Sequence, residues 1–326
     1  MAENSTKQAV PQAPADEAAD GAARTAIADS DARIAAAEGI GSASTGSPLK
    51  RFVRRLVRQK LAMLSLAVLV FFILVAIFSD LLMPYDPTDQ SLLDKNLPPH
   101  NAHPFGTDDL GRDVLSRMID GTAITLLAPV IAVVVGLVIG VPFGLLAGYF
   151  GGWIDWLSSR VADALFAIPG IILAMAIVAV RGQSTVNAMI AVGILFAPRF
   201  FRVLRGETMA VRTSMYVDAA KTIGASPLRV IRTHILPNVA PSLIVQCTVM
   251  LGYGVLVEAG LSFFGIGVQP PEASWGVVLR RSFESINELP FQSLPPGLAI
   301  TVLILALQFL GDGMRDSLGK EIRNAK

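Results

Sequence analysis

Residues 216–238 read YVDAAKTIGASPLRVIRTHILPN, a short charged segment punctuated by glycine and proline. The segment lies between two long apolar runs, so it is the part of the chain best placed to meet water-soluble machinery. Gly224 can adopt the backbone conformation that ends a helix, and Pro227 suits the first position of the next one. The pattern predicts two short helices that meet at an angle at the glycine and lie at a membrane surface. We call residues 214–238 the elbow.

The composition around the elbow is that of a membrane protein. Of the 326 residues, 52% are hydrophobic and only 16% are charged, whereas soluble domains carry about 25% charged residues. The net charge of +1 gives no overall field that would favour nucleic acid. The single cysteine, Cys247, has no partner for an intrachain disulfide and no companions for a metal site, and it is interpreted as a buried core thiol.

Six charge-free runs approach the length of about 20 helical residues that crosses the hydrocarbon core of a bilayer. The fourth run is the weakest, because it needs Phe200 and Phe201 to reach full length. The sequence therefore predicts an all-α membrane protein with six transmembrane helices. The runs are residues 61–79, 121–154, 164–180, 182–198, 235–257 and 289–311.

The segments between and outside these runs complete the predicted organisation. The N-terminal part is rich in Ala, Ser, Gly and acidic residues, which indicates a disordered tail, and it lacks the pattern of a signal peptide. The predicted parts are a disordered cytoplasmic tail (1–49), a basic segment with the first span (50–85), an outer loop (86–120), a five-span core that holds the elbow (121–318) and a cytoplasmic C-terminal tail (319–326).

Lys and Arg in the short loops set the predicted orientation. The loop of residues 199–232 alone carries seven basic residues, whereas the segment of residues 80–120 is rich in Asp. Basic loops face the cytoplasm, so both termini and the elbow are predicted to lie inside. Residues 80–120, the neighbourhood of Arg181 and residues 258–288 are then predicted to lie outside.

Ionisable residues within the predicted spans are too few to form a relay. Such residues are costly in a membrane and mark ion or proton paths, so their scarcity argues against a proton-coupled transporter or a charge-ring channel. Glu258 and Asp163 are the candidates, and both fall near predicted helix ends, where water is close. A structural role is favoured for each.

The second run carries glycines at four-residue steps, which keeps them on roughly one helix face. Glycines on one face let a neighbouring backbone approach closely, which is how helices associate in lipid. We interpret this face as a packing surface without chemistry of its own. The predicted packing residues are Gly136, Gly140, Gly144 and Gly148. Pro142 and Pro169 lie inside apolar runs and are candidate kinks.

Two outer segments hold the remaining motifs, HPFGTDDLGRDVLSR at residues 103–117 and GVQPPEASWG at residues 267–276. Thr107, Asp108 or Asp109 is predicted to cap a helix that leads into the second span. His100 and His103 beside these carboxylates match no metal-ligand spacing, so no metal site is predicted. The second segment is rigid and aromatic, and it is expected either to cover the pore mouth or to touch an outside partner. The candidate contact residues are Asp108, Asp109, Arg112, Gln269 and Trp275.

The elbow resembles the EAA loop of binding-protein-dependent ABC importer permeases. That pattern is Glu-Ala-Ala, three residues, Gly, nine residues, Ile, one residue and Leu-Pro. The matching residues are Tyr216, Asp218, Ala219, Ala220, Gly224, Leu236 and Pro237. Asp218 replaces the glutamate and His234 replaces the isoleucine, and both departures resemble the dipeptide/oligopeptide/nickel branch. The outer motifs, GYFGGWID at 148–155 and the C-terminal run resemble the C-type permease subunit of that branch, from about residue 51 to residue 318.

This resemblance implies a type I ABC importer permease fold with a cytoplasmic coupling helix, set in the cytoplasmic (inner) membrane. It implies a homologous second permease, two ATPase subunits that bind the elbows, and an extracytoplasmic binding protein that delivers peptides. Tyr216, Asp218, Ala219, Ala220 and Gly224 would then couple the permease to the ATPases. ATP and Mg²⁺ would be bound by those ATPases, and no cofactor is expected in this chain.

The chain carries no G-x-x-x-x-G-K-[ST] phosphate loop, because Gly319-Lys320 is followed by glutamate and lacks the earlier glycine. It is therefore not an enzyme by this criterion, and energy must come from another subunit. The cargo stays open between peptides, nickel and other small solutes. A stand-alone channel or secondary transporter is the competing reading, disfavoured by the missing intramembrane charges. A membrane-bound enzyme is disfavoured because no catalytic triad or metal-ligand set is evident.

Overall fold

The computed structural model describes residues 48–324, and their secondary structure is helical apart from one isolated bridge between Thr107 and Asp113. The predicted disordered tail, residues 1–49, falls almost entirely outside this range, as does the very end of the C-terminal tail. Residues Phe52–Lys326 form one compact unit, and the account below concerns this unit. The basic segment forms helix α2 (Pro48–Val57), which precedes the first span.

Five stretches of the described chain are long and apolar enough to cross a membrane, and a sixth crossing is a bent pair of helices. The structure thus confirms an all-α architecture with up to six spans. The straight spans contain α3 (Lys60–Ile77), α5 (Val114–Phe150), α8 (Thr185–Val211), α11 (Leu236–Phe263) and α13 (Leu294–Asn324). The bent pair is α6 (Gly152–Ala167) and α7 (Gly170–Arg181), and short helices α4 (Ser79–Leu82) and α12 (Trp275–Glu284) lie between spans.

The third predicted span, residues 164–180, is broken at Pro169, one of the two candidate kinks. α6 and α7 meet at 90°, and Pro169 stands at the break. Proline lacks an N–H and pushes the preceding residue into extended backbone, which Ile168 adopts with φ −87° and ψ 126°. The second apolar run is also divided, because Gly151 and Gly152 take positive φ values of 65° and 59° and start α6. Pro142 lies inside a continuous α5 instead.

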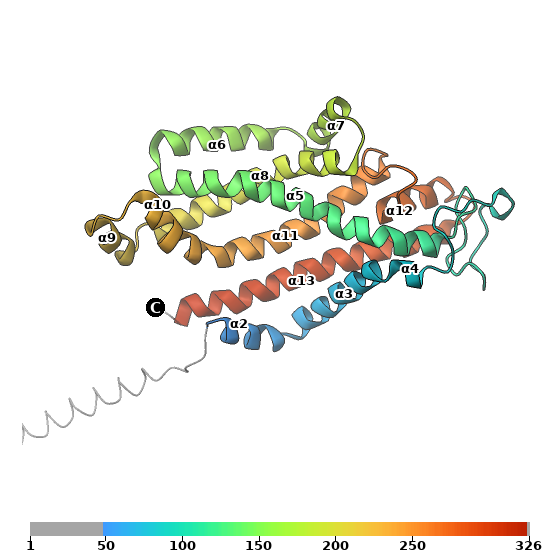
Figure 1. Ribbon diagram of the computed structural model, residues 1–326, viewed down its shortest axis with the longest axis horizontal. Helices are drawn as coiled ribbons and strands as arrows, with labels where there is room; N and C mark the ends of the chain where they lie inside the picture. Colours follow the sequence, from blue (N-terminus) through green and yellow to red (C-terminus); the bar gives the residue numbers. More distant parts are fainter. Residues whose placement is uncertain (1–47, 325–326) are drawn as a thin grey trace, which may run out of the picture. The chain divides into compact units, whose positions relative to one another are not determined.

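α5 and α8 form the central helix pair of the unit (Figure 1). Their contacts advance together along both chains, so the two helices run in the same direction. The four glycines of α5 lie on this contact. A Cβ on Gly144 would stand 2.8 Å from the carbonyl oxygen of Phe201, and one on Gly148 would stand 2.6 Å from the Cβ of Thr208. Only glycine permits this approach, because real Cβ atoms essentially never come so close.

The other helices surround this pair (Figure 1). α6 and α7 lie along one side of α5 and α8, whereas α11, α13 and α3 follow one another on the opposite side. Gly313 of α13 gives α3 the same kind of close approach, since a Cβ there would stand 2.6 Å from the Cβ of Ala62. Helices α9 and α10 lie at one end of the unit, and α4 and α12 lie at the other (Figure 1).

Residues 199–232 do not form one loop, which corrects the prediction of a loop over this range. α8 continues to Val211, so Arg199, Arg202 and Arg205 all lie on a helix. Arginine has a good intrinsic helix propensity, and two of the three are stabilised by carboxylates on α6. Arg202 pairs with Asp163 at 2.8 Å, and Arg205 donates two hydrogen bonds to Asp155.

Replacing Gly140 by alanine should destabilise the folded chain, because its Cβ would press on the backbone of Ala197. Overpacking of this kind costs about 1–3 kcal/mol. Gly206→Ala on α8 is the matched control, because a Cβ there meets nothing within 4 Å while the gain in helix propensity is the same. In detergent, we expect G140A to lower the thermal midpoint and G206A to preserve or raise it. Equal midpoints would contradict the close packing described above.

Candidate functional site

The elbow has one side packed on the helix bundle and the other side open. Its first helix, α9 (Met215–Thr222), buries Val217 and Ala220. These two side chains join a hydrophobic cluster with Leu145 of α5 and Leu204 of α8. Burying a side chain such as valine contributes about 1.5–3 kcal/mol. The contact therefore ties α9 to the central helix pair.

Gly224 makes the turn that follows α9. Its φ of +82° lies in the left-handed region that favours glycine. The N–H of Ala225 donates to the carbonyl of Ala220 at 3.0 Å, and the N–H of Gly224 donates to that of Lys221 at 3.0 Å. These two bonds form a Schellman motif, which satisfies carbonyls at the helix end and fixes the direction of the chain. The turn is thus a defined corner.

The second half of the elbow is continuous with the fifth span, which corrects the prediction of two separate short helices. α10 (Pro227–Val230) starts with proline at its first position and passes through a π-helical turn, η2 (Ile231–Ile235), into α11. In that turn the N–H of Leu236 donates to the carbonyl of Ile231. Val230, Ile231 and Ile235 are buried against the same cluster as Val217. Both arms of the corner therefore rest on the bundle.

The open side of the elbow carries large apolar side chains. Met215 is 88% exposed, Ile223 is 86% exposed and Leu228 is 68% exposed. Because Met215 and Ile223 lie outside the spans and Leu228 lies at the very start of one, lipid does not account for their exposure, so the three mark a candidate contact surface. Sequence reasoning missed these three residues, although large apolar residues in a charged loop were a usable signal. We call them the elbow's apolar tip.

The predicted coupling residues divide between the two sides. Ala220 is buried and Leu236 is half-buried, whereas the other five are exposed: Tyr216, Asp218, Ala219, Gly224 and Pro237. Asp218 pairs with Lys221 on α9 at 3.0 Å. The ring of Tyr216 stands 6.3 Å from that of His234. Arg212, just before the elbow, donates to the carbonyl of Tyr149 at 2.8 Å and so holds the end of α5.

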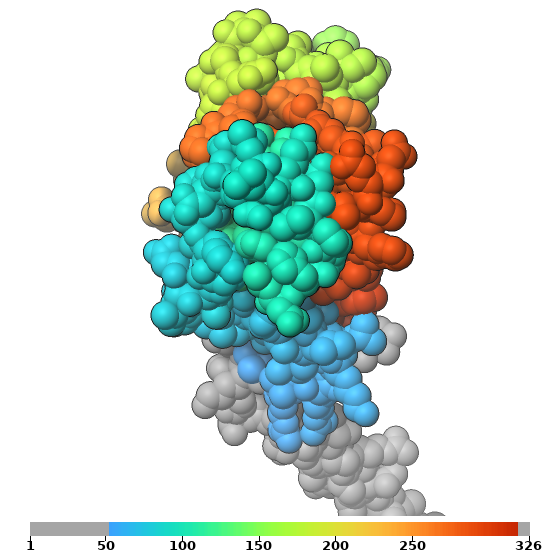
Figure 2. All heavy atoms as spheres, turned by 90° about the vertical axis from the view of Figure 1, so that its right-hand side faces the viewer, coloured from blue at the N-terminus to red at the C-terminus, as the bar shows by residue number. Residues whose placement is uncertain are grey.

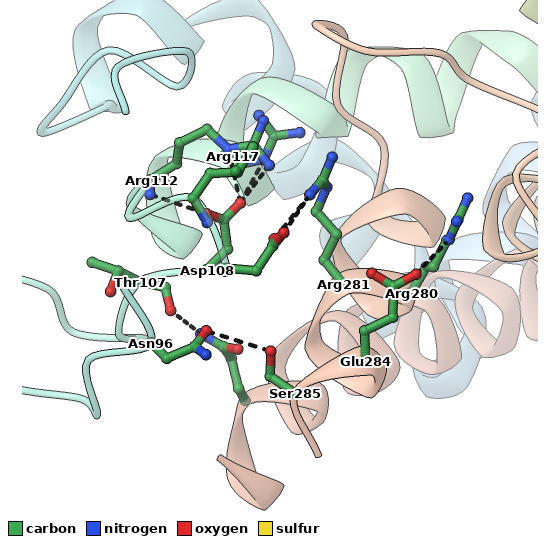
Figure 3. A network of polar contacts seen from close by, with 12 residues as sticks. Asn96, Thr107, Asp108, Arg112, Arg117, Arg280, Arg281, Glu284 and Ser285 are labelled. Atoms are coloured by element: carbon green, nitrogen blue, oxygen red, sulfur yellow. Dashed lines mark hydrogen bonds and ion pairs between the residues drawn. The ribbon is translucent and has the colours of Figure 1, made fainter. Parts of the chain in front are cut away.

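A polar network joins the outer loop to α12 and to the residue that follows it, at the opposite end of the unit (Figure 3). In the structure this loop covers residues 83–113. Asp108 accepts from Arg112 at 2.8 Å and lies 3.9 Å from Arg117, and both arginines are buried. Asp109 pairs with Arg281 of α12 at 2.8 Å. A buried charge is tolerated only when it is paired, so the pairs fix the loop in place.

Several predicted outer contact residues do not reach the surface. Asp108, Arg112 and Trp275 are all less than 5% exposed, so their proposed contact with an outside protein is wrong for these side chains. Trp275 donates from Nε1 to the carbonyl of Met118 at 2.9 Å. The predicted helix cap is also wrong, because Asp113 caps α5 by accepting from the N–H of Ser116.

On the outer face the outer loop (teal) lies beside the segment that runs from α11 to α13 (orange), as Figure 2 shows. Asp109 and Gln269 remain partly exposed there. Gln269 donates from Nε2 to the carbonyls of Gly265 and Gly267, at 3.2 and 3.1 Å. Gln292, near the start of α13, donates to the carbonyl of Thr107 at 2.7 Å and adds a further link across this face.

The ionisable residues singled out by the sequence differ in their surroundings. Glu258 is fully buried and accepts from Ser262 at 2.7 Å, so its predicted placement near water is wrong. Asp163 is exposed and pairs with Arg202. Cys247 is half-buried and packs against the hydrophobic core, in line with its interpretation as a core thiol. Across residues 48–324, no group of three His, Cys, Asp or Glu side chains could hold a metal ion.

The chain is similar to known permeases over most of its length. Residues 140–324 match the family described as the binding-protein-dependent transport system inner membrane component. Residues 47–99 match the N-terminal transmembrane domain of oligopeptide transport permease C. The glutathione transport system permease protein GsiD of Escherichia coli O1:K1 / APEC is 42% identical over 278 residues, which cover 85% of this chain and 92% of that protein. Its counterpart from Shigella boydii serotype 4 is 41% identical over the same coverage.

A solved structure shows the same fold at lower sequence identity. The inward-facing MetNI methionine ABC transporter superposes with a TM-score of 0.52 at 22% identity, covering 63% of this chain and 96% of its own. The aligned regions thus share a fold. The chain belongs to the family of binding-protein-dependent inner-membrane transport permeases, in its oligopeptide permease C branch.

Proposed function

We propose that this chain is a membrane subunit of an ATP-driven importer that carries small peptides across the inner membrane. Separate ATPase subunits bind the elbow and change the conformation of this chain. Family membership makes the chain a multi-pass membrane permease without catalysis of its own, served by an ATPase and a binding protein. The proposal adds the cargo, the coupling residues and the composition of the complex. It rests most of all on the exposed apolar tip at a corner whose other side is packed on the bundle.

The elbow has the properties that mechanical coupling requires. Met215, Ile223 and Leu228 offer an apolar surface to a partner, and a Cβ on Gly224 would meet nothing of this chain within 4 Å. A partner that displaces α9 also displaces α8, because Val217 and Leu204 pack in one cluster. We assign ATP and Mg²⁺ to the ATPases. A nucleotide-driven change of state then reaches the membrane helices through contact.

The complex that we propose contains a homologous second permease, two ATPases and an extracytoplasmic binding protein. We assign the end that holds the elbow, and both termini, to the cytoplasm, and the Lys and Arg of that end support the assignment through the positive-inside rule. Asp109 and Gln269 are the candidates for contact with the binding protein, since both are partly exposed on the outer face. Lipid covers the apolar helix faces that no subunit contacts.

The cargo that we propose is a small peptide, and glutathione is the first one to test. The relatives at 41–42% identity are glutathione permeases by name, and glutathione is a tripeptide. Cells that lack this chain should lose uptake of labelled glutathione or of labelled trialanine, and the restored gene should recover it. The peptide assignment would be contradicted if cells without this chain took up both peptides at the normal rate but lost uptake of nickel.

Replacing Gly224 by valine should abolish most peptide uptake while the protein still inserts in the membrane. Valine is strained at φ +82° by roughly 1–2 kcal/mol, and its branched side chain would enter the space left for the ATPase. Gly182→Val is the matched control, because Gly182 also has a positive φ, 92°, and open surroundings but lies outside. Gly224→Asn tolerates the left-handed region and should retain more uptake. Normal uptake by G224V would remove the coupling role.

The double substitution Met215→Ser and Ile223→Ser should weaken binding of the ATPase. Each of these side chains, if buried against the ATPase, contributes about 1.5–3 kcal/mol to the free energy of binding. Their loss should therefore lower the affinity by at least about tenfold. Pull-down of the ATPase by the purified permease in detergent measures this change. Leu93→Ser removes a side chain that is 95% exposed in the outer loop and should leave binding unchanged. Full ATPase retention by the double variant would rule out the tip as the docking surface.

A further inference from the structure

A groove runs between α8 and α11, and two cavities of about 620 and 770 Å³ lie along it. Both volumes fall in the range of about 300–1,000 Å³ of small-molecule sites. Arg199 and Tyr253 line the first cavity, and Ser242 and Gln246 line the second. On each helix the residues that line the two cavities recur at three- or four-residue steps, and such a spacing puts them on one continuous face of the helix. The two cavities therefore follow one path along the pair of helices.

The broken span borders the first cavity. Its lining includes Ile168, Pro169 and Gly170, the residues at which α6 and α7 part. Non-helical backbone at membrane depth is tolerated where it is buried in protein or faces a water-filled space. The break therefore supplies the cavity with polar backbone groups and with access to water. This is the environment that a hydrated cargo requires.

Arg199 lies deep in the membrane zone. It is 14 residues beyond the first residue of α8, Thr185, or about 21 Å along the helix. Its neighbour Ala197 packs at Gly140 of α5, which has at least 14 charge-free residues on either side. Half the thickness of a hydrocarbon core is about 15 Å, so this level is near the middle. A charge at that depth is costly and usually serves a transport path.

Arg199 differs from the other arginines of α8 in its partners. Arg202 and Arg205 both pair with carboxylates of α6, whereas no carboxylate of residues 52–318 lies within 4.0 Å of the Arg199 guanidinium. Arg199 instead stands 4.2 Å from the ring centre of Tyr253 and 4.0 Å from the sulfur of Met250. The aromatic ring holds the cation in the cavity wall without neutralising it. One N–H of the guanidinium donates to the Met250 sulfur, a weak acceptor, and the other donors are available for an anion.

We propose that Arg199 binds the C-terminal carboxylate of the peptide cargo as the cargo passes through this groove. The inference rests on the proposed function, since it assumes that the cargo is a peptide. A guanidinium matches a carboxylate with two parallel N–H donors. Tyr253 positions Arg199, and the apolar walls from Phe166 and Leu256 accept cargo side chains of varied shape. The groove thus selects the charged end that all free peptides share.

The test uses the assembled importer in liposomes and compares trialanine with trialanine amide, which lacks the carboxylate charge. The measured quantity is the ratio of ATP-driven uptake rates, acid over amide, at low cargo concentration. Because the same binding protein delivers both cargoes to every variant, its own preference cancels when these ratios are compared. Arg199→Gln should lower the ratio by at least about tenfold, the effect of losing a charge-assisted hydrogen bond. Arg199→Lys should retain part of the preference.

Arg280→Gln is the control, because Arg280 is exposed and pairs with Glu284 away from the groove. ATP hydrolysis stimulated by the binding protein should stay near the wild-type rate in R199Q. An unchanged acid-to-amide ratio in R199Q would overturn the assignment. It would also be overturned if R199Q lost both subunit assembly and ATP hydrolysis, because that result indicates that Arg199 pairs with a carboxylate of a partner subunit. Absence of wild-type uptake of trialanine would overturn the proposed peptide function and this assignment together.

Discussion

The close approach of α5 to α8 is the constraint on which the other features of the molecule depend. Lipid chains are as apolar as leucine, so helices in a bilayer gain little from hiding apolar surface and associate by packing their backbones closely. Four glycines of α5 provide that contact, and Gly193 returns it from α8, since a Cβ there would stand 2.5 Å from the Cβ of Val135. Two helices joined in this way move as one body.

The elbow is built onto one end of this body. Gly148 is the last glycine of the contact, and a Cβ there would stand 2.6 Å from the Cβ of Thr208. Arg212 follows one turn later and holds the carbonyl of Tyr149. The Schellman turn at Gly224 and the buried Val217 then fix α9 against the same helices. Force applied to the apolar tip therefore reaches the middle of the membrane without passing through a flexible joint.

The sequence predicted most of the architecture, because the signals involved are local. Charge-free runs give the number of spans, and the left-handed turn at Gly224 follows from its place between two helical segments. The breaks were harder to predict. Gly151-Gly152 and Pro169 lie inside apolar runs, and nothing local distinguishes them from Pro142, which α5 includes without a break. Counting Arg199 as part of a loop failed because arginine is rare at membrane depth, and its cavity forms only when α8 meets α11.

The residues of the outer loop and of α12 also show that burial caused by long-range contacts is not predicted from sequence. Asp108, Arg112 and Trp275 are polar or aromatic residues in segments predicted as loops, which is the usual composition of a contact surface. In the structure these segments pack together through contacts of Trp275 with Met118 and of Gln292 with Thr107, which join residues more than 150 positions apart. Pairings at such separations cannot be read from spacing along one chain.

The chain contains arginines that are buried beside a carboxylate and an arginine, Arg199, that lies beside an aromatic ring. The two environments differ in how easily the charge can change its partner. Arg112 and Arg117 are buried beside Asp108, and a buried pair resists rearrangement because separating it leaves an uncompensated charge. Arg199 is half-buried beside the ring of Tyr253 and the sulfur of Met250. A carboxylate of the cargo can replace water at its guanidinium, and no ion pair within the protein has to be broken. A transporter needs both arrangements, since its outer end must keep its shape while its interior takes up and releases cargo. The carboxylate beside Arg112 and Arg117 fits a rigid end, and the absence of an ion pair at Arg199 within residues 52–318 fits the carboxylate-binding role that we propose for it.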